Sequence, residues 1–317
     1  MAFTTIDDPS AHFQTVLYSG NGSTQSITND GNSDLQPDWL WFKSRNDSQE
    51  HQLFDTNRGI AKSLKVSTDP ENTDDPNDRL TAINSDGFSL GSDGNPNNGS
   101  NTYVCWQWKA NGGSLTTASE SGSNVGYSRQ VNTTSGFAII KYTGLGSTAA
   151  VIHGMGATPN FYTVKRLSGT GYSWYTYHHK NTSVPHTDNL YLNNTDSTTD
   201  NDTVWDDQAP SSTEIKIGTN SGVNADGVEY IMYAFAEKKG FSKFGKYKGN
   251  GNADGPFVFT GFKPAFILGK NTASNGNHWF INDNQRGING GANWIKSDTN
   301  GAELTNLTNP DFLSNGF

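Results

Sequence analysis

Two aspartate–arginine pairs with the same spacing are the first candidates for chemistry in this sequence. Asp55 and Arg58 lie in the stretch DTNRGI, and Asp283 and Arg286 lie in the closely matching stretch DNQRGI. A carboxylate and a guanidinium held together could bind a polar ligand, because both form charge-assisted hydrogen bonds. The alternative is structural: the aspartate accepts backbone N–H bonds in a turn, and the arginine completes a local ion pair. The sequence favours the structural interpretation and leaves ligand binding open.

Aromatic residues are the second candidate, because they could form a platform for sugar rings. Trp174, Tyr175 and Tyr177 follow a Gly- and Ser-rich stretch and alternate with polar residues in GYSWYTYHH. Trp205 and Trp294 also lie in polar surroundings. Aromatic side chains fill β-sandwich cores as readily as they stack on ligands. We therefore expect core residues here, with glycan stacking as the alternative.

The other polar clusters predict no metal and no cofactor. His178 and His179 are adjacent, so on a strand they would point to opposite faces, and with His186 they make a poor zinc site. We expect exposed polar residues instead. The acidic stretch at residues 67–78 lacks the ligand spacing and central glycine of a helix–loop–helix calcium site, which predicts a solvated loop. Cys105, the single cysteine, has no base nearby in the sequence and is expected to be a small buried side chain.

The sequence does not predict an enzyme. Glycoside hydrolysis needs two carboxylates about 5–10 Å apart, and no aspartate is embedded in an apolar strand that would raise its pKa. The sequence contains no GxSxG, HExxH or Walker motif. Its Gly-x-Gly strings follow tyrosine without a helical pattern, so nucleotide binding is not expected.

Composition excludes several classes of protein. Of the 317 residues, 32% are hydrophobic and 12% aromatic, so aromatic side chains must supply much of the core. The formal net charge of −9 argues against nucleic-acid binding, and the chain has no apolar run long enough for a membrane span. The N-terminal sequence is acidic where a secretory signal is basic, and a lone cysteine forms no internal disulfide. We therefore expect folding in a reducing cytoplasm without general secretory export.

One pattern occurs three times along the chain. The strings YSGNG, YTGLG and YKGNG begin at Tyr18, Tyr142 and Tyr247, and a proline follows each tyrosine after 17 to 19 residues. An aromatic residue stands two positions after each proline and a lysine six positions after it. These landmarks are Pro37, Trp39 and Lys43, then Pro159, Phe161 and Lys165, then Pro264, Phe266 and Lys270. Fixed spacing over such distances predicts three tandem copies of one unit of roughly 100 residues.

The third copy is shorter than the others. The strand-like stretches YVCWQW at Tyr103 and YIMYAF at Tyr230 close the first two copies, and the sequence stops at Phe317 before any counterpart. A sheet without that strand would have an unpaired edge. Three explanations are open: the natural polypeptide continues past residue 317, which we favour; a neighbouring chain supplies the strand; or a half-module caps the array.

The local patterns are those of strands. In DWLWFK, Trp39 and Trp41 face one side and Leu40 and Phe42 the other, so this strand should be central. Asn- and Gly-rich turns separate such stretches, which predicts an all-β protein of tandem concanavalin-like or jelly-roll β-sandwich modules. The predicted parts are module 1 at residues 1–112, a linker or long loop at 113–135, module 2 at 136–240 and an incomplete module 3 at 241–317.

The motifs as a set resemble a known family. The stretch at residues 3–43 and the strings SDGFSLG, YVCWQWKANGG and FAEKKGFSKFGKYKGNG are similar to an uncharacterised repeated domain of structural proteins in marine tailed bacteriophages. The similarity covers essentially the whole chain. It implies a virion component with concanavalin-like or jelly-roll sandwiches, and it transfers no catalytic residue.

These observations lead to one expected function and two alternatives. We expect a non-enzymatic virion structural protein, of tail or fibre type, that assembles in the host cytoplasm. Its expected partners are other virion proteins, further copies of itself with a trimer favoured, and host-surface glycans. Nucleic acid and membrane insertion are not expected. The alternatives are a polysaccharide depolymerase on the same scaffold and a purely architectural filament or decoration subunit.

Overall fold

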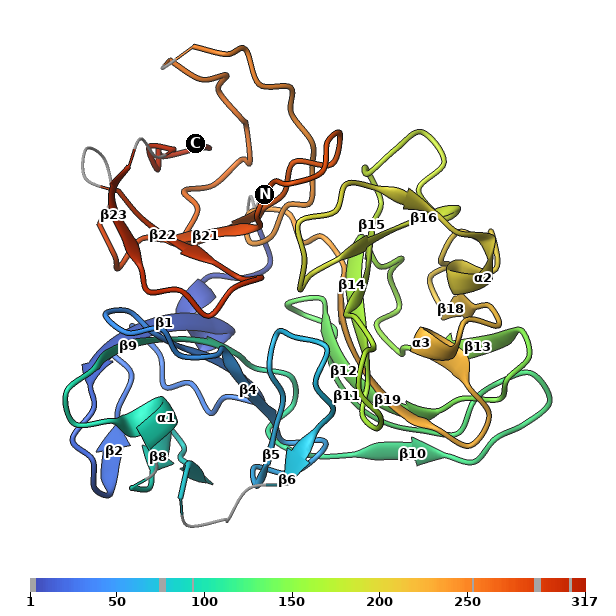
Figure 1. The fold of residues 1–317 in the computed structure, drawn as a ribbon, viewed down its shortest axis with the longest axis horizontal. Helices are drawn as coiled ribbons and strands as arrows, with labels where there is room; N and C mark the ends of the chain where they lie inside the picture. Colours follow the sequence, from blue (N-terminus) through green and yellow to red (C-terminus); the bar gives the residue numbers. More distant parts are fainter. Residues whose placement is uncertain (1–3, 74–77, 93, 253, 288–291, 308–309) are drawn as a thin grey trace.

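The chain folds almost entirely into antiparallel strands. The computed structural model describes residues 4–73, 78–92, 94–252, 254–287, 292–307 and 310–317. Its strands form several antiparallel sheets, and its helices have only three or four residues. This confirms the predicted all-β class with a β-sandwich architecture. Figure 1 shows three lobes around a common centre, coloured in chain order from blue through green to red.

Module 1 is a sandwich of two sheets, with strand orders β1-β9-β3-β4 and β2-β8-β7. The strands of these sheets are β1 (Phe13–Ser19), β2 (Gln25–Ile27), β3 (Trp39–Ser44), β4 (Gln52–Asp55), β7 (Leu80–Ile83), β8 (Phe88–Leu90) and β9 (Thr102–Trp108). A small hairpin and two short helices complete the module: β5 (Lys62–Ser63), β6 (Asn72–Thr73), η1 (Pro9–Ala11) and α1 (Gly94–Asn97). Leu40, Phe42 and Cys105 fill the space between the two sheets.

Module 2 has a wider main sheet and a smaller second sheet. Its strand order is β10-β11-β12-β19-β14-β15-β16-β17, and β13-β18 forms the second sheet. The strands are β10 (Thr116–Ala118), β11 (Tyr127–Asn132), β12 (Phe137–Thr143), β13 (Ala149–Ile152), β14 (Phe161–Arg166), β15 (Tyr175–His178), β16 (Asp188–Tyr191), β17 (Thr199–Asp200), β18 (Glu214–Ile217) and β19 (Glu229–Phe235). The helices are α2 (Asp202–Trp205) and α3 (Ser221–Asn224).

The prediction of a linker at residues 113–135 is wrong in this respect: β10 and β11 lie there and extend the main sheet of module 2. Tyr127 pairs with Tyr142 and Asn132 with Phe137 along the β11–β12 ladder. Val125 is buried in the module core, and Tyr127 packs against that core. These few apolar residues anchor the segment, although its polar composition is typical of a loop.

Module 3 has one four-stranded sheet, with the order β20-β21-β22-β23. Its strands are β20 (Phe266–Gly269), β21 (Phe280–Asp283), β22 (Ala292–Lys296) and β23 (Leu304–Leu307). The sheet matches β3-β4 of module 1 and β14-β15-β16 of module 2. In each module the first of these strands begins two residues after the landmark proline, and its first residue pairs with the last residue of the following strand.

The same contact occurs inside module 1 and inside module 2, and it explains the tyrosine that begins each of their landmark strings. Tyr18 stacks on Tyr103, and Tyr142 stacks on Tyr230, with the ring centroids 5.2 Å apart in both pairs. The string continues with a glycine because another backbone passes close by. A Cβ atom on Gly20 would lie 2.1 Å from a carbonyl oxygen of Asn98, so a larger residue would not fit.

A third core lies where the three main sheets meet. Its buried members come from every module and include Trp39 and Trp106 of module 1, Ile139 and Tyr233 of module 2, and Ile281 of module 3. The predicted central strand β3 is buried on both faces because Leu40 and Phe42 face the sandwich while Trp39 and Trp41 face this shared core. No helix among the described residues is long and apolar enough to span a membrane.

Candidate functional site

The two aspartate–arginine pairs lie against the shared core and are completely buried. Arg58 Nε donates to Asp55 Oδ2 at 2.5 Å, and both side chains have 0% exposure. The Arg58 guanidinium also bonds to Glu71 at 3.1 Å and to the carbonyl oxygen of Leu53 at 3.3 Å. Burial opposes the charged form of Arg58, but the nearby Asp55, Tyr233 and Glu71 outweigh it, so its pKa is raised.

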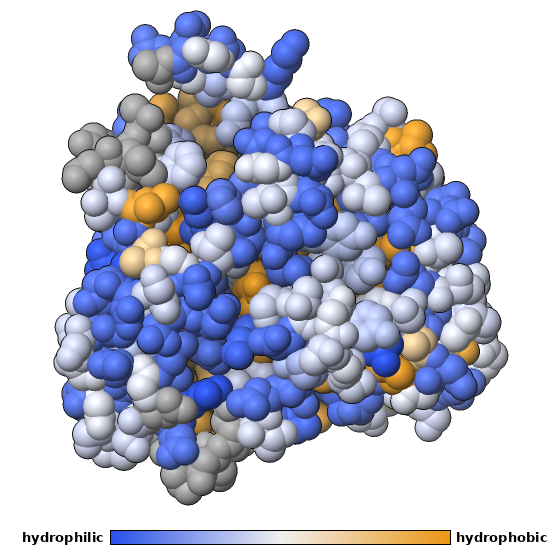
Figure 2. Space-filling model, in the orientation of Figure 1, coloured by the Kyte–Doolittle hydropathy of each residue, from blue (hydrophilic) through white to orange (hydrophobic). Residues whose placement is uncertain are grey.

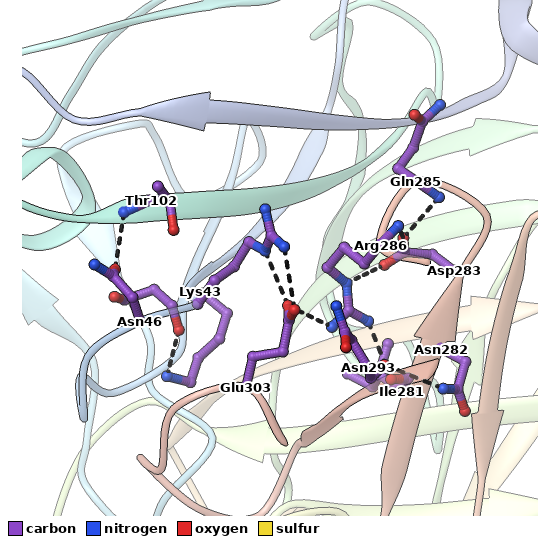
Figure 3. Close-up of polar contacts among 12 residues, drawn as sticks. Lys43, Asn46, Thr102, Ile281, Asn282, Asp283, Gln285, Arg286, Asn293 and Glu303 are labelled. Carbon is purple, nitrogen blue, oxygen red and sulfur yellow. Dashed lines mark hydrogen bonds and ion pairs between the residues drawn. The ribbon is translucent and has the colours of Figure 1, made fainter. Parts of the chain in front are cut away.

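The pair in module 3 repeats the three bonds just described. Arg286 Nε donates to Asp283 Oδ2 at 2.6 Å, and the guanidinium also bonds to Glu303 and to the carbonyl oxygen of Ile281, both at 3.1 Å. Figure 3 shows Glu303 facing Arg286 across from Asp283. Glu303 also accepts two bonds from Arg45 of module 1, at 2.9 and 3.1 Å. The charges of this cluster are therefore satisfied by protein groups.

An aromatic residue of a neighbouring module completes each pair. The Tyr233 hydroxyl donates to Asp55 at 2.6 Å, from module 2 to module 1. The Trp106 indole N–H donates to Asp283 at 2.8 Å, from module 1 to module 3. Tyr233 and Trp106 are the fourth residues of YIMYAF and YVCWQW, so the two contacts are equivalent. Module 2 has His178 at the position of Asp55 and Asp283, where β15 ends.

A second set of hydrogen bonds occurs at all three interfaces between modules. Their donors and acceptors follow one another in the same direction around the three modules. In each module, one residue lies four positions before Asp55, His178 or Asp283. Its ring N–H donates a hydrogen bond to a backbone carbonyl of another module. The bonds run from Trp174 to Lys65 at 2.9 Å, from His51 to Lys296 at 3.0 Å and from Trp279 to Tyr191 at 2.8 Å. They therefore pass from module 2 to module 1, from module 1 to module 3, and from module 3 to module 2.

Backbone hydrogen bonds link the same three pairs of modules. The acceptor in each is the carbonyl two residues after the landmark lysine. The bonds are Glu71 N to Leu167 O at 2.9 Å, Glu303 N to Arg45 O at 2.8 Å and Thr198 N to Thr272 O at 3.1 Å. Together the ring and backbone bonds give every interface the same two contacts. We call these six bonds the interface ring.

The landmark lysines take part in this packing. Lys43 and Lys165 are buried, and their ammonium groups cross to a neighbouring module: Lys43 bonds to the carbonyl of Asn300 at 3.2 Å and Lys165 to that of Ser67 at 3.0 Å. Burial lowers the pKa of both lysines to about 8. Their spacing could be read from the sequence, but their role as links between modules could not.

The aromatic residues considered as an alternative glycan platform are buried or half-buried. Trp174 has 0% exposure and Tyr177 has 3%. Tyr177 stacks on Tyr162 with the centroids 4.6 Å apart. Tyr175 is half-buried beside Gly222 of α3, and Trp205 lies in the core of module 2. These residues fill space, as the core interpretation expects.

The histidines and the acidic stretch are structural where they are described. His179 is half-buried and links Asn160 to the carbonyl oxygen of Phe244, which differs from the expected exposed position. Residues 74–77 of the acidic stretch lie outside the described residues, whereas Glu71 is held by Arg58 and Lys62. Within the described part of the chain, no group of three His, Cys, Asp or Glu side chains could hold a metal ion.

One surface hollow lies at the junction of modules 2 and 3. Its volume is about 610 Å³, and its lining includes Lys180, Lys243, Lys246, His179 and Phe244. Lys243 also pairs with Glu237 at 2.9 Å. Glu237 also lines this hollow, so its three lysines leave a net positive charge there, which favours an anion.

Comparison with known proteins places the chain in a family. A model of the DUF7483 domain, a domain of unknown function, matches residues 8–317. The chain belongs to the DUF7483 family. No curated protein and no solved structure gives a significant match. The DUF7483 match covers all three modules and the whole interface ring.

Removing one member of a buried pair should be costly in this DUF7483 protein. We expect Asp55→Ala to lower the free energy of unfolding by about 3–5 kcal/mol, because Arg58 would remain buried without its carboxylate. The control is Asp69→Ala, which breaks the exposed Lys65–Asp69 pair and should cost at most about 1 kcal/mol. Urea denaturation measures both. Equal losses in the two variants would contradict the structural role of the buried pair.

The buried His51 should make stability depend on pH. Its Nδ1 accepts from the Trp41 indole at 2.7 Å, so the neutral ring carries its proton on Nε2, which bonds to Lys296. Burial and then Lys43 lower the pKa of His51 from 6.5 to about 3. Between these values the unfolded chain binds a proton that the folded chain excludes. The free energy of unfolding should therefore fall as the pH falls through this window, by at most about 1.4 kcal/mol per pH unit from this group.

The variant His51→Gln removes this titration. Its free energy of unfolding should be lower than that of the parent at neutral pH, and it should decrease less steeply between about pH 6 and about pH 4. Denaturant titrations at several pH values measure the slope. An identical slope in parent and variant would rule out His51 as a source of the acid sensitivity.

Proposed function

We propose that this DUF7483 chain is a non-enzymatic structural protein of a bacteriophage virion, built from three copies of one β-sandwich module closed into a ring. The observation that carries the proposal is the interface ring, in which each module makes the same two bonds to its neighbour. Independent domains on flexible linkers would not repeat such contacts. The resemblance to repeated domains of marine phage structural proteins supplies the context of a tail or fibre-type appendage.

The fate of the candidate residues supports an architectural role. Both aspartate–arginine pairs form hydrogen bonds to an aromatic residue of another module. Trp174 donates its indole N–H to a backbone carbonyl of module 1. Charged groups that are fully buried and bonded to protein have no face left for a substrate. The residues with the most distinctive spacing therefore hold the modules together.

This architecture suits a particle component that other virion proteins contact. A single chain already arranges three similar surfaces around one centre, as Figure 1 shows for the three lobes. Such a chain could sit on a symmetric appendage, alone or as a trimer of chains. Assembly in the host cytoplasm agrees with the single free cysteine, which is buried.

The location of the protein tests this proposal against the depolymerase alternative. We expect antibodies against the purified chain to label tails or fibres of intact particles in electron micrographs. We also expect no new reducing ends when the chain is incubated with host capsule or lipopolysaccharide. Labelling of unassembled lysate protein only, or steady release of reducing ends, would overturn the structural, non-enzymatic assignment.

Contact with host-surface glycans is a second candidate function, and the hollow beside Phe244 favours acidic glycans. Three lysines line it together with an aromatic ring and one carboxylate, Glu237. We expect Lys243→Glu combined with Lys246→Glu to abolish retention on an acidic polysaccharide column at low salt, because attraction becomes repulsion. The control is Lys216→Glu, on β18 and outside the hollow, which should leave retention unchanged. Equal losses would indicate a general charge effect without a site.

A further inference from the structure

Module 2 differs from modules 1 and 3 at three equivalent positions. The first directly follows the landmark lysine, the second directly follows the residue that donates the ring N–H of the interface ring, and the third accepts such a bond at its backbone. The residues are Arg166, Tyr175 and Tyr191 in module 2, Ser44, Gln52 and Lys65 in module 1, and Asn271, Phe280 and Lys296 in module 3. Because the interface ring forms with each of these sets, it does not require the arginine and the two tyrosines of module 2.

The fold brings these three residues of module 2 together beside α3. Tyr175 and Tyr191 are paired residues of β15 and β16, and their rings meet edge to face with the centroids 5.2 Å apart. Tyr175 also lies against α3, where a Cβ atom on Gly222 would be 2.1 Å from its ring. Arg166 reaches the same helix, because its Nη1 donates to the Ser221 carbonyl at 3.2 Å. The short helix therefore links the arginine to the two tyrosines.

A third tyrosine covers the arginine. The Cζ atom of Arg166 lies 4.0 Å from the centroid of the Tyr172 ring, which is a cation–π contact. Burial, and then the nearby Tyr191 and Tyr172, raise the pKa of Tyr175 to about 12. The Tyr175 hydroxyl therefore keeps its proton at neutral pH and can donate a hydrogen bond. We call Arg166, Tyr172, Tyr175 and Tyr191 the tyrosine cluster.

The tyrosine cluster is partly open to solvent. All four of its residues are half-buried, and the adjoining loop at residues 168–171 is exposed. Arg166 donates to the carbonyls of Ser168 at 2.9 Å and Ser221 at 3.2 Å, and among the described residues it forms no ion pair with a carboxylate. A guanidinium has five N–H donors, so donors remain for a ligand that carries negative charge.

The surroundings of the cluster favour a small polar ligand over a protein surface. Specific protein–protein interfaces bury about 1,200–2,000 Å² around a centre rich in apolar and aromatic residues. The loop beside the cluster has the sequence SGTG, and Figure 2 shows only small, separate apolar spots on the hydrophilic surface of the module 2 side. Aromatic rings can contact the C–H groups of a sugar while hydroxyl groups bond to its oxygens. The planar guanidinium matches the geometry of a carboxylate.

We propose that the tyrosine cluster of module 2 binds a sugar unit that carries a carboxylate. Arg166 pairs with the carboxylate, and the tyrosine rings and hydroxyls hold the sugar ring. Such a site rests on the proposed contact with host-surface glycans, and it is separate from the lysine-lined hollow. The hollow attracts an anionic chain through its charge, whereas the cluster recognises one sugar unit by shape and hydrogen bonding.

Tetragalacturonate is the probe, and cellotetraose is its uncharged counterpart. We expect the chain to bind tetragalacturonate saturably in titration calorimetry, and to bind cellotetraose about tenfold more weakly or less, because the bond to Arg166 is absent. The variant Arg166→Gln should weaken the binding of tetragalacturonate by about tenfold or more. Tyr175→Phe combined with Tyr191→Phe keeps both rings and should weaken it by about threefold to tenfold, because the hydroxyl bonds are lost.

The matched control is Arg129→Gln, which removes the same charge elsewhere in module 2. Arg129 also lies over a tyrosine ring, 4.7 Å from the centroid of Tyr127, and it also donates to a backbone carbonyl, that of Ile152. This variant should bind tetragalacturonate within about twofold of the parent, because a distant surface charge is screened. Circular dichroism shows whether each variant is folded, and the double phenylalanine variant decides the result if Arg166→Gln is not.

Three results would overturn the assignment of the tyrosine cluster. The first is the absence of saturable binding up to about 10 mM tetragalacturonate, and the second is equal weakening by Arg166→Gln and Arg129→Gln. The third is unchanged binding by Arg166→Gln. If Lys243→Glu with Lys246→Glu then abolishes binding, the hollow is the glycan site and only the cluster is excluded. If no acidic glycan binds the parent chain, the glycan function fails as well. An Arg166→Gln chain that binds the sugar normally but is missing from particles would assign the cluster to a protein partner.

Discussion

Several buried polar groups at the shared core are satisfied by residues of another module, and this constraint fixes how the modules meet. A buried carbonyl or N–H group without a partner costs about 1–3 kcal/mol, whereas a satisfied one contributes about 0.5–1.5 kcal/mol. The carbonyls of Lys65, Tyr191 and Lys296 each receive a ring N–H from the neighbouring module. The modules are thus held by directional bonds as well as by apolar contact, which fixes their rotation about the common centre.

Aromatic strands that are apolar on both faces make this arrangement feasible. A sandwich of short strands needs only one apolar face on its main sheet. Here the second face of the β3 and β9 sheet carries Trp39, Trp41 and Trp106, and it is covered by the sheets of the other modules. Few hydrophobic residues therefore build three cores, because each large ring removes much surface from water.

The buried charges are best understood through their position between modules. Asp55 with Arg58, and Asp283 with Arg286, each sit where one sheet meets an aromatic residue of the next. A buried ion pair is weak evidence for stability, but it fixes geometry, since only one alignment satisfies every lone pair and proton. The third interface, between modules 2 and 3, differs from the other two in both features. It has His178 where the others have an aspartate, and its β20 strand is paired on one side.

The sequence alone determined the class, the landmarks and the direction of most strand faces. The period-two pattern in DWLWFK correctly assigned Trp39 and Trp41 to one face and Leu40 and Phe42 to the other, because side-chain direction in a strand follows from local alternation. The tertiary structure decided what the distinctive residues do. Arg58 and Tyr233 are 175 positions apart, and Trp106 and Asp283 are 177 apart, so no local pattern indicates these contacts. The strands at residues 113–135 were missed for the same reason: polar segments become strands when a neighbouring edge accepts their backbone, and that edge exists only in the folded chain.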